Sequence, residues 1–185
     1  FVFLFFGFIR KYKGLDLLLE AFTKLKQSPI PNSQFPIPNP KLLIAGEFYE
    51  DRKTYDSLIE QLGIKDDLIL KTEFIADSEV KYYLCAADAV IQPYRNATQS
   101  GVTRLAYHFE KPMVVTNVGG LPSLVPDKKV GLVVEPNPAA IAEGILNFYQ
   151  LGENYFIPHL RNEKQKYSWA TMAGTISQLA NDIQK

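Results

Sequence analysis

The stretch ADAVIQPYRNATQSGVTRLAYHFEKPMVVTNVGGLP, residues 87–122, decides the fold. A short apolar run at 89–91 is followed by a polar loop and then by apolar residues at i, i+3, i+4 and i+7, namely Val102, Leu105, Ala106 and Phe109. This spacing predicts one buried face of a helix, which ends before Pro112. A second apolar run at 113–115 follows. Strand, loop, helix and strand in this order are typical of an α/β protein.

The same alternation extends over the whole chain. Short apolar runs begin near Val2, Leu42, Leu68, Ala89, Met113 and Gly131, and helical patterns lie between them. Continuous apolar strands are typical of a parallel sheet that is covered on both faces. We therefore predict a doubly wound, Rossmann-like α/β fold with six parallel strands and helices on both faces. Two further helices are expected after the last strand, from about 139 to 151 and from about 171 to the end.

Ligands of such sheets bind in the loops at the carboxyl ends of the strands. Those loops are 7–13, 46–50, 73–77, 93–99 and 117–121. After the loop at 93–99, Ser100 and Gly101 stand where the helix that carries Val102 and Leu105 begins. Ser100 can cap the first N–H groups, and a helix N-terminus is an anion site because these groups point outward. Ordinary capping without a ligand is the alternative interpretation.

Composition excludes several classes of function. The 185 residues suffice for one buried domain, and the 20 basic residues equal the 20 acidic ones, so we expect no nucleic-acid partner. The single cysteine, Cys85, excludes an internal disulfide and is expected to pack within a helix. His108 and His159 lack metal-ligand spacing, so no metal is expected.

Two segments stand outside the α/β pattern. The first apolar run begins at residue 1 without an initiator Met, which we interpret as a piece of a longer protein. Residues 28–40, SPIPNSQFPIPNP, hold five prolines, which predicts a polyproline-like surface insertion. A proline ligand for a partner protein is the less favoured interpretation of this segment.

Five motifs carry a resemblance to a known family. Residues 6–22, FGFIRKYKGLDLLLEAF, resemble the FxGRLxxxKGxDxLLEAF start of the C-terminal half of family 4 (group 1) glycosyltransferases. Residues 43–46 resemble the LxIxG strand, 85–94 resemble xxADVxxxPS, and 111–122 resemble GxPVVATxxGGxPE. Tyr167-Ser168-Trp169 resembles the FSW that precedes the terminal helix of that family. The resemblance covers nearly the whole chain except the proline-rich insertion.

This resemblance implies a GT-B architecture, in which the C-terminal domain binds a nucleotide-sugar donor. Residues 1–185 would then be the donor half, and its partner would be the N-terminal domain of the same protein, which supplies the acceptor site. The family implies retaining transfer from a UDP- or GDP-sugar, with no metal and no further cofactor. It also implies a cytoplasmic protein, with any peripheral membrane association made through the missing domain.

The motifs and the strand ends together select the candidate site. The residues expected to act in catalysis are Arg10, Lys13 and Gln99, since two cations facing a helix N-terminus can hold a diphosphate. The residues expected at the donor phosphates and sugar are Gly7, Thr98, Ser100, Gly101 and Val102. The nucleotide base is expected against Phe74 and Ile75.

The sequence also departs from the family pattern. Counted back from Pro112, the positions of the two family glutamates hold Ala97 and Leu105, and Leu105 is expected to pack against the sheet. One interpretation is a subfamily in which residues 98–101 bind the donor. The others are a degenerate nucleotide-sugar-binding or interaction domain without catalysis and, as a lesser alternative, a GT-B sugar-nucleotide epimerase.

Overall fold

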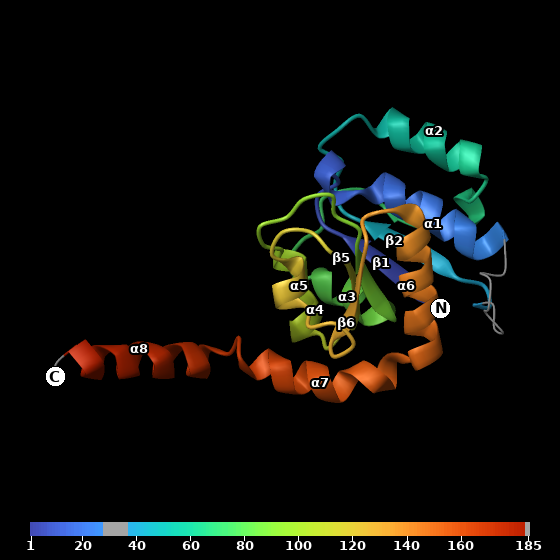
Figure 1. The fold of residues 1–185 in the computed structure, drawn as a ribbon. Helices are drawn as coiled ribbons and strands as arrows, with labels where there is room; N and C mark the ends of the chain where they lie inside the picture. Colours follow the sequence, from blue (N-terminus) through green and yellow to red (C-terminus); the bar gives the residue numbers. More distant parts are fainter. Residues whose placement is uncertain (28–36, 184–185) are drawn as a thin grey trace.

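The computed structural model describes residues 1–27 and 37–183 and contains the predicted sheet. Its strands are β1 (Val2–Phe6), β2 (Lys41–Ala45), β3 (Leu68–Lys71), β4 (Ala89–Gln92), β5 (Met113–Thr116) and β6 (Gly131–Val134). All neighbouring strands are parallel, in the order β3-β2-β1-β4-β5-β6 (Figure 1). The predicted doubly wound α/β fold with six parallel strands is therefore confirmed.

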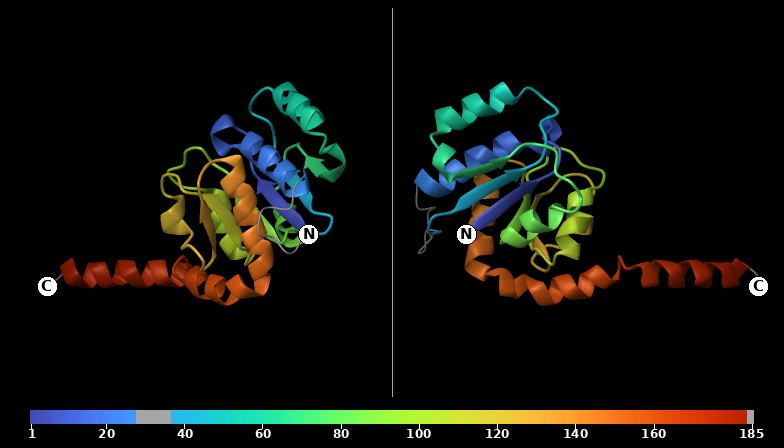
Figure 2. Two further views of the ribbon diagram at one scale, coloured as in Figure 1. Left: turned by 45° about the vertical axis from the view of Figure 1, so that its right-hand side comes forward. Right: turned by 180° about the vertical axis from the view of Figure 1, so that it is seen from behind.

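Helices cover both faces of this sheet (Figures 1 and 2). They are α1 (Leu15–Gln27), α2 (Arg52–Leu62), α3 (Val80–Ala86), α4 (Gly101–His108), α5 (Leu121–Leu124), α6 (Pro138–Leu151), α7 (Glu153–Gln165) and α8 (Trp169–Ile183). Two 3₁₀ turns, η1 (Lys11–Lys13) and η2 (Lys65–Asp67), precede α1 and β3. Helix α1 packs against α6 on one face, and α3 and α4 lie on the other.

Burial on both faces explains why β1 is apolar at every position. Phe3, Leu4 and Phe5 are each fully buried, since helices lie above and below the centre of the sheet. On one side of β1 the chain proceeds to β2, and on the other side β1 pairs with β4. The loops that leave β1 and β4 therefore diverge, and this topological switch point is where a ligand crevice opens in doubly wound sheets.

Three local expectations need correction. Helix α7 was not among the predicted helices; Pro158 lies inside it, and its buried residues Phe156 and Leu160 hold it on the domain. The last helix begins at Trp169 rather than near 171. Cys85 lies in α3 as expected, but its side chain is exposed rather than packed.

The proline-rich insertion predicted at 28–40 falls mostly outside the described residues. Of its described end, 37–40, Ile37 and Pro40 are buried, whereas Pro38 and Asn39 are exposed as predicted. Ile37 belongs to the hydrophobic core just before β2 begins.

Helix α8 leaves the domain and extends away from it (Figures 1 and 2). Its apolar residues recur on one face and are largely exposed, namely Trp169, Met172, Ile176, Leu179 and Ile183. Neither α8 nor any other helix in residues 1–27 and 37–183 is both long and apolar enough to cross a membrane.

Candidate functional site

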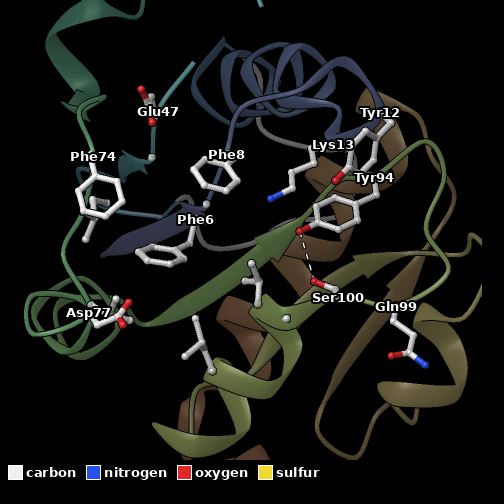
Figure 3. Close-up of a pocket in the computed structure, with 17 residues that line it drawn as sticks. Phe6, Phe8, Tyr12, Lys13, Glu47, Phe74, Asp77, Tyr94, Gln99 and Ser100 are labelled. Atoms are coloured by element: carbon white, nitrogen blue, oxygen red, sulfur yellow. Dashed lines mark hydrogen bonds between the residues drawn. The ribbon is translucent and has the colours of Figure 1, made fainter. Parts of the chain in front are cut away.

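A pocket of about 430 Å³ opens at the carboxyl ends of β1, β2 and β4 (Figure 3). Its walls come from the loop after β1, from Gly46 and Glu47 after β2, from the 74–77 segment before α3, and from the first residues of α4. These are the segments that the parallel order of the strands brings to one edge of the sheet. Four of the five loops expected to carry function contribute residues to it, and 117–121 does not.

Lys13 supplies the cation of this pocket. Its side chain is 9% exposed, and its ammonium group points into the pocket (Figure 3). Within residues 1–27 and 37–183, no acceptor or carboxylate lies within bonding distance of Nζ. Burial, with a smaller contribution from the charge of Arg10, lowers the pKa of Lys13 from 10.5 to about 8.

Gly7 allows Lys13 to reach this position. Its φ of +91° lies in the region that favours glycine, and a Cβ atom here would stand 3.0 Å from the Lys13 Nζ. The floor beside the ammonium is the ring of Tyr94, whose centroid lies 5.7 Å from Nζ. At this distance a cation and an aromatic face attract each other.

The N-terminus of α4 forms the second part of the site. Ser100 has the extended backbone of a capping residue, but its side chain makes no capping hydrogen bond. The Ser100 Oγ instead lies 3.3 Å from the Tyr94 hydroxyl. The cap expected from the sequence is therefore not formed. The described part of the chain offers no acceptor to the backbone N–H groups of Gly101, Val102 and Thr103.

The turn that carries Lys13 is fixed to the end of β4. Arg95 makes two hydrogen bonds to the carboxylate of Asp16, with Nη1–Oδ1 at 2.6 Å and Nη2–Oδ2 at 2.7 Å. The backbone N–H of Arg95 donates to the Tyr12 carbonyl at 2.7 Å. Gly14 packs so closely that a Cβ atom would lie 2.0 Å from the Pro93 carbonyl oxygen. These contacts set the distance between the cation and α4.

A second loop supports the residues that lead into α4. The N–H of Gly120 donates to the Ala97 carbonyl at 3.1 Å. A Cβ atom on Gly119 would lie only 1.6 Å from the same oxygen, and one on Gly120 would lie 2.2 Å from the Thr98 oxygen. Both glycines are therefore needed for this close approach, and the 117–121 loop acts behind the pocket rather than in it.

Most of the predicted site residues do meet in the pocket. Those that line it are Gly7, Lys13, Phe74, Ile75, Gln99, Ser100, Gly101 and Val102. Among the residues predicted to act in catalysis, Gln99 lies at the edge, and its amide points away from the Lys13 ammonium (Figure 3). Phe74 stands on the opposite side and is 72% exposed, so one of its faces is open to a ligand.

Arg10 and Thr98 are not brought into the pocket lining. The guanidinium of Arg10 lies over the ring of Tyr49, 4.9 Å from its centroid, and Tyr49 in turn packs on Phe8. Arg10 is thus held outside the lining of the pocket. Its charge is still close enough to lower the pKa of Lys13. Thr98 is exposed, and its carbonyl faces Gly120.

The two positions that hold glutamate in the resembled family have different surroundings. Ala97 is 8% exposed and covered by the 119–120 loop. Leu105 was expected to pack against the sheet, but it is half-buried and lines the pocket. It lies one turn after Gly101, which also lines the pocket. Leu105 thus adds to an apolar wall with Phe6 and Val80.

Sequence reasoning missed several residues of the pocket. Glu47 and Asp77 line it on the side away from Lys13, and Tyr12 and Tyr94 line it beside Lys13 (Figure 3). Glu47 and Asp77 lie in loops that the sequence marks as strand ends, so their position was a usable signal. Nothing in the local pattern around Tyr94 indicates its contacts. In the described ranges, no group of three or more His, Cys, Asp or Glu residues is placed to hold a metal ion.

Comparison with known proteins places the chain among enzymes of one kind. An uncharacterized glycosyltransferase of Methanocaldococcus jannaschii is 29% identical over 176 residues, which cover 92% of this chain and 42% of the relative. The structure of Anabaena HepE in complex with UDP-glucose has a TM-score of 0.78 at 20% identity and covers 98% of this chain and 49% of that one. The C-terminal domain of the group 1 glycosyl transferase LpcC of Francisella tularensis has a TM-score of 0.69 at 24% identity, covering 89% of this chain and 83% of that one.

These matches cover less than half of each curated relative. The chain spans 42% of the length of the curated relatives that it matches. The family model described as glycosyl transferases group 1 matches residues 1–166, which is most of the chain. The chain therefore belongs to the group 1 glycosyl transferases.

Proposed function

We propose that this chain is the donor-binding half of a glycosyltransferase, which transfers a sugar from a nucleotide-diphosphate sugar to an acceptor. The observation that carries the proposal is the position of a buried Lys13, whose charge no described residue neutralises, opposite the open N-terminus of α4 at the switch point of the sheet. An ammonium group and outward-pointing N–H groups are both ligands for phosphate. The complex of Anabaena HepE with UDP-glucose supports a nucleotide-sugar ligand in this fold.

In the proposed reaction, the bond between the anomeric carbon and the diphosphate breaks, and the nucleotide diphosphate leaves with the electron pair. An acceptor hydroxyl oxygen forms the new bond to the anomeric carbon, and its proton passes to the leaving phosphate. The negative charge that grows on the leaving phosphate is stabilised by Lys13 and by the N–H groups of Gly101 and Val102. Removing one such preorganised donor typically costs about 3 kcal/mol of transition-state stabilisation. We further propose a retaining outcome and a metal-independent mechanism, in which Lys13 and α4 supply the charge stabilisation.

The remaining walls suit the other parts of such a ligand. Phe74 and Ile75 offer an apolar surface to the nucleotide base at the side away from Lys13. Gln99 and Thr98 stand near the start of α4, where the transferred sugar would lie. Arg10 would contribute to binding of the diphosphate if its side chain leaves the Tyr49 ring.

A degenerate donor domain is the second candidate, and a specific observation favours it. Where the family pattern has glutamates, Ala97 is buried and Leu105 presents an apolar side chain to the pocket. Neither side chain accepts a hydrogen bond from a ribose or sugar hydroxyl. In this case the domain would bind a nucleotide sugar without supporting transfer.

The missing partner would be the preceding half of the same protein. The relatives are more than twice as long as the matched segment, and the apolar face of α8 is exposed over its length. Exposed apolar stripes of this extent mark interaction surfaces. We propose that the N-terminal half supplies the acceptor site and covers this face of α8.

A thermal-shift screen against UDP-, GDP- and ADP-sugars tests the proposal. A clear rise in the unfolding midpoint with one of them identifies the donor, since a ligand that binds only the folded state stabilises it. No shift with any of them would contradict the proposal. Turnover of the intact protein should then fall in Lys13→Ala and Gln99→Ala, with Lys11→Ala as the control outside the pocket. Donor binding without any turnover would support the degenerate domain instead.

A further inference from the structure

Tyr94 contacts both parts of the proposed anion site. It follows β4, and only 3% of its surface is exposed. Its ring lies below the Lys13 ammonium at 5.7 Å, and its hydroxyl lies 3.3 Å from the Ser100 Oγ (Figure 3). The ring of Tyr12 meets it edge-on at 6.2 Å between centroids. A single side chain thus bridges the cation and the residue that begins α4.

Ser100 is in the right backbone conformation to cap α4, yet it does not. Its φ of −134° and ψ of 119° are those of a capping residue. Two other helices show the expected bond: Asp51 accepts from the Lys53 N–H at 3.0 Å, and Asn137 accepts from the Ala140 N–H at 2.9 Å. Ser100 differs from these two residues because its Oγ forms a hydrogen bond with the Tyr94 hydroxyl.

We propose that Tyr94 is a positioning residue, whose hydroxyl turns Ser100 away from its own helix and so keeps the first N–H groups of α4 open for the phosphate of the ligand. Its ring meanwhile supports the Lys13 ammonium on the other side of the same phosphate. The proposal rests on the proposed function, because it assigns the anion of the nucleotide sugar to this site.

The physical basis is competition for the same donors. A capping serine accepts from the N–H of the second or third helical residue, here Val102 or Thr103. A phosphate bound at the helix N-terminus accepts from the same groups. When the Ser100 Oγ accepts from one of these N–H groups, the ligand must displace it. The free energy of a serine cap corresponds to about a fivefold change in the binding constant of the ligand.

The backbone of Tyr94 is held independently of its hydroxyl. The Thr116 Oγ1 donates to the Tyr94 carbonyl at 2.6 Å. The next residue, Arg95, is tied to Tyr12 and to Asp16. Loss of the hydroxyl alone should therefore leave the fold in place and release only the Ser100 side chain.

The test compares Tyr94→Phe with the wild type in the intact protein. We measure sulfate binding and nucleotide-sugar binding by calorimetry, and hydrogen exchange of the Val102 and Thr103 amides without ligand. We expect about threefold to fivefold weaker binding of sulfate and of the nucleotide sugar, and slower exchange at one of the two amides, because Ser100 then caps α4. Tyr107→Phe is the control. It removes a tyrosine hydroxyl that lies on α4 itself and donates to the Leu124 carbonyl at 2.8 Å, and it should change neither binding nor these amides.

A double-mutant cycle with Ser100→Ala decides the mechanism. If Tyr94 acts by holding Ser100, then Tyr94→Phe has no further effect on sulfate binding once Ser100 is replaced by alanine. The same loss of affinity in both backgrounds, or unchanged exchange at both amides in Tyr94→Phe, would overturn the proposal. The exchange measurement needs no ligand. If exchange at one of these amides slows in Tyr94→Phe but no nucleotide sugar binds the wild type, the proposed function fails. The role of Tyr94 in keeping Ser100 from capping α4 then stands.

Discussion

Replacing Lys13 by methionine should stabilise the domain and at the same time weaken anion binding. The ammonium group is buried, and no described residue pairs with its charge, so the folded state holds its proton less tightly than the unfolded state does. The pKa falls from 10.5 to about 8, mainly because of burial and further because of Arg10. This difference of about 2.5 corresponds to a folding cost of about 3 kcal/mol.

The sign of this cost fixes its pH dependence. A lysine with a lowered pKa destabilises the folded state fully below about pH 8, and the cost disappears as the pH rises from about 8 towards 10.5. Lys13→Met keeps the apolar stem and removes the charge. We therefore expect it to raise the free energy of unfolding at pH 7 by up to about 3 kcal/mol and by much less near pH 10. Urea unfolding at the two pH values measures this difference.

Anion binding should weaken as the pH rises and Lys13 loses its proton, whereas the stability of the domain rises. With a pKa of about 8, Lys13 is roughly 90% protonated at pH 7 and roughly 10% protonated at pH 9. Sulfate does not titrate in this range, so its affinity for the wild type should fall about tenfold between these values if only the ammonium form binds it. Lys13→Met should bind sulfate weakly and without this pH dependence. Calorimetry should also detect proton uptake on binding near pH 8.

Lys11 provides the matched control for Lys13. It lies on the same 3₁₀ turn, but it is exposed and outside the pocket. Lys11→Met should therefore change neither stability nor sulfate binding. If Lys13→Met loses stability at pH 7 while sulfate binds as before, the ammonium serves the fold and the reasoning above is wrong. An affinity for sulfate that stays constant from pH 7 to pH 9 would refute it as well.

Three further predictions concern the loop behind the pocket, the last helix and the carboxylates. Gly119→Ala should lower the free energy of unfolding by about 3 kcal/mol or more, because its φ is +51° and its new Cβ would meet the Ala97 oxygen. Gly63→Ala, at φ +65° in open space, should lower it by about 1 kcal/mol. Equal losses in urea unfolding would contradict this. Ile176→Asp on α8 should leave donor affinity unchanged but lower turnover of the intact protein, and unchanged turnover would show that this face has no partner. Asp77→Asn should weaken nucleotide-sugar binding about threefold to tenfold without weakening sulfate binding, since its carboxylate would accept hydroxyl groups; calorimetry that shows a loss of both would exclude this role.

The strands and their positions along the chain, though not their order in the sheet, could be derived largely from the sequence because burial on both faces leaves a simple pattern. The fully buried run at β1 and the four buried residues of β4 are unbroken apolar or nearly apolar segments. Only the ends shifted, where Lys41 and Lys71 extend β2 and β3 by a residue. Helix α7 was missed because Pro158 interrupts its pattern and few of its residues are apolar. Its packing on the domain, which the sequence does not display, overrides that local preference.

The site was predictable at the level of the backbone and much less so at the level of side chains. Lys13 and Ser100 could be brought together because parallel strands place their carboxyl ends at one edge. The rotamers of Arg10 and Ser100 depend on aromatic neighbours instead. Arg10 lies over Tyr49, which belongs to a different loop, and Ser100 faces Tyr94 at the end of β4. Such contacts link residues across loops and have no periodic signature.

Whether the domain still binds a donor, as distinct from transferring its sugar, depends on what the buried ammonium does. The two positions without glutamate give no decision, because Ala97 is covered by a loop and Leu105 completes an apolar wall that can hold part of a ligand. Lys13 is different. A buried cation without a carboxylate partner among the described residues lowers the stability of the domain, and the attraction of the Tyr94 ring does not offset this cost. A bound phosphate would remove this cost by pairing with the ammonium, so binding and stability are coupled at this one residue. Lys13 therefore favours a domain built to hold an anion over one that has lost its ligand.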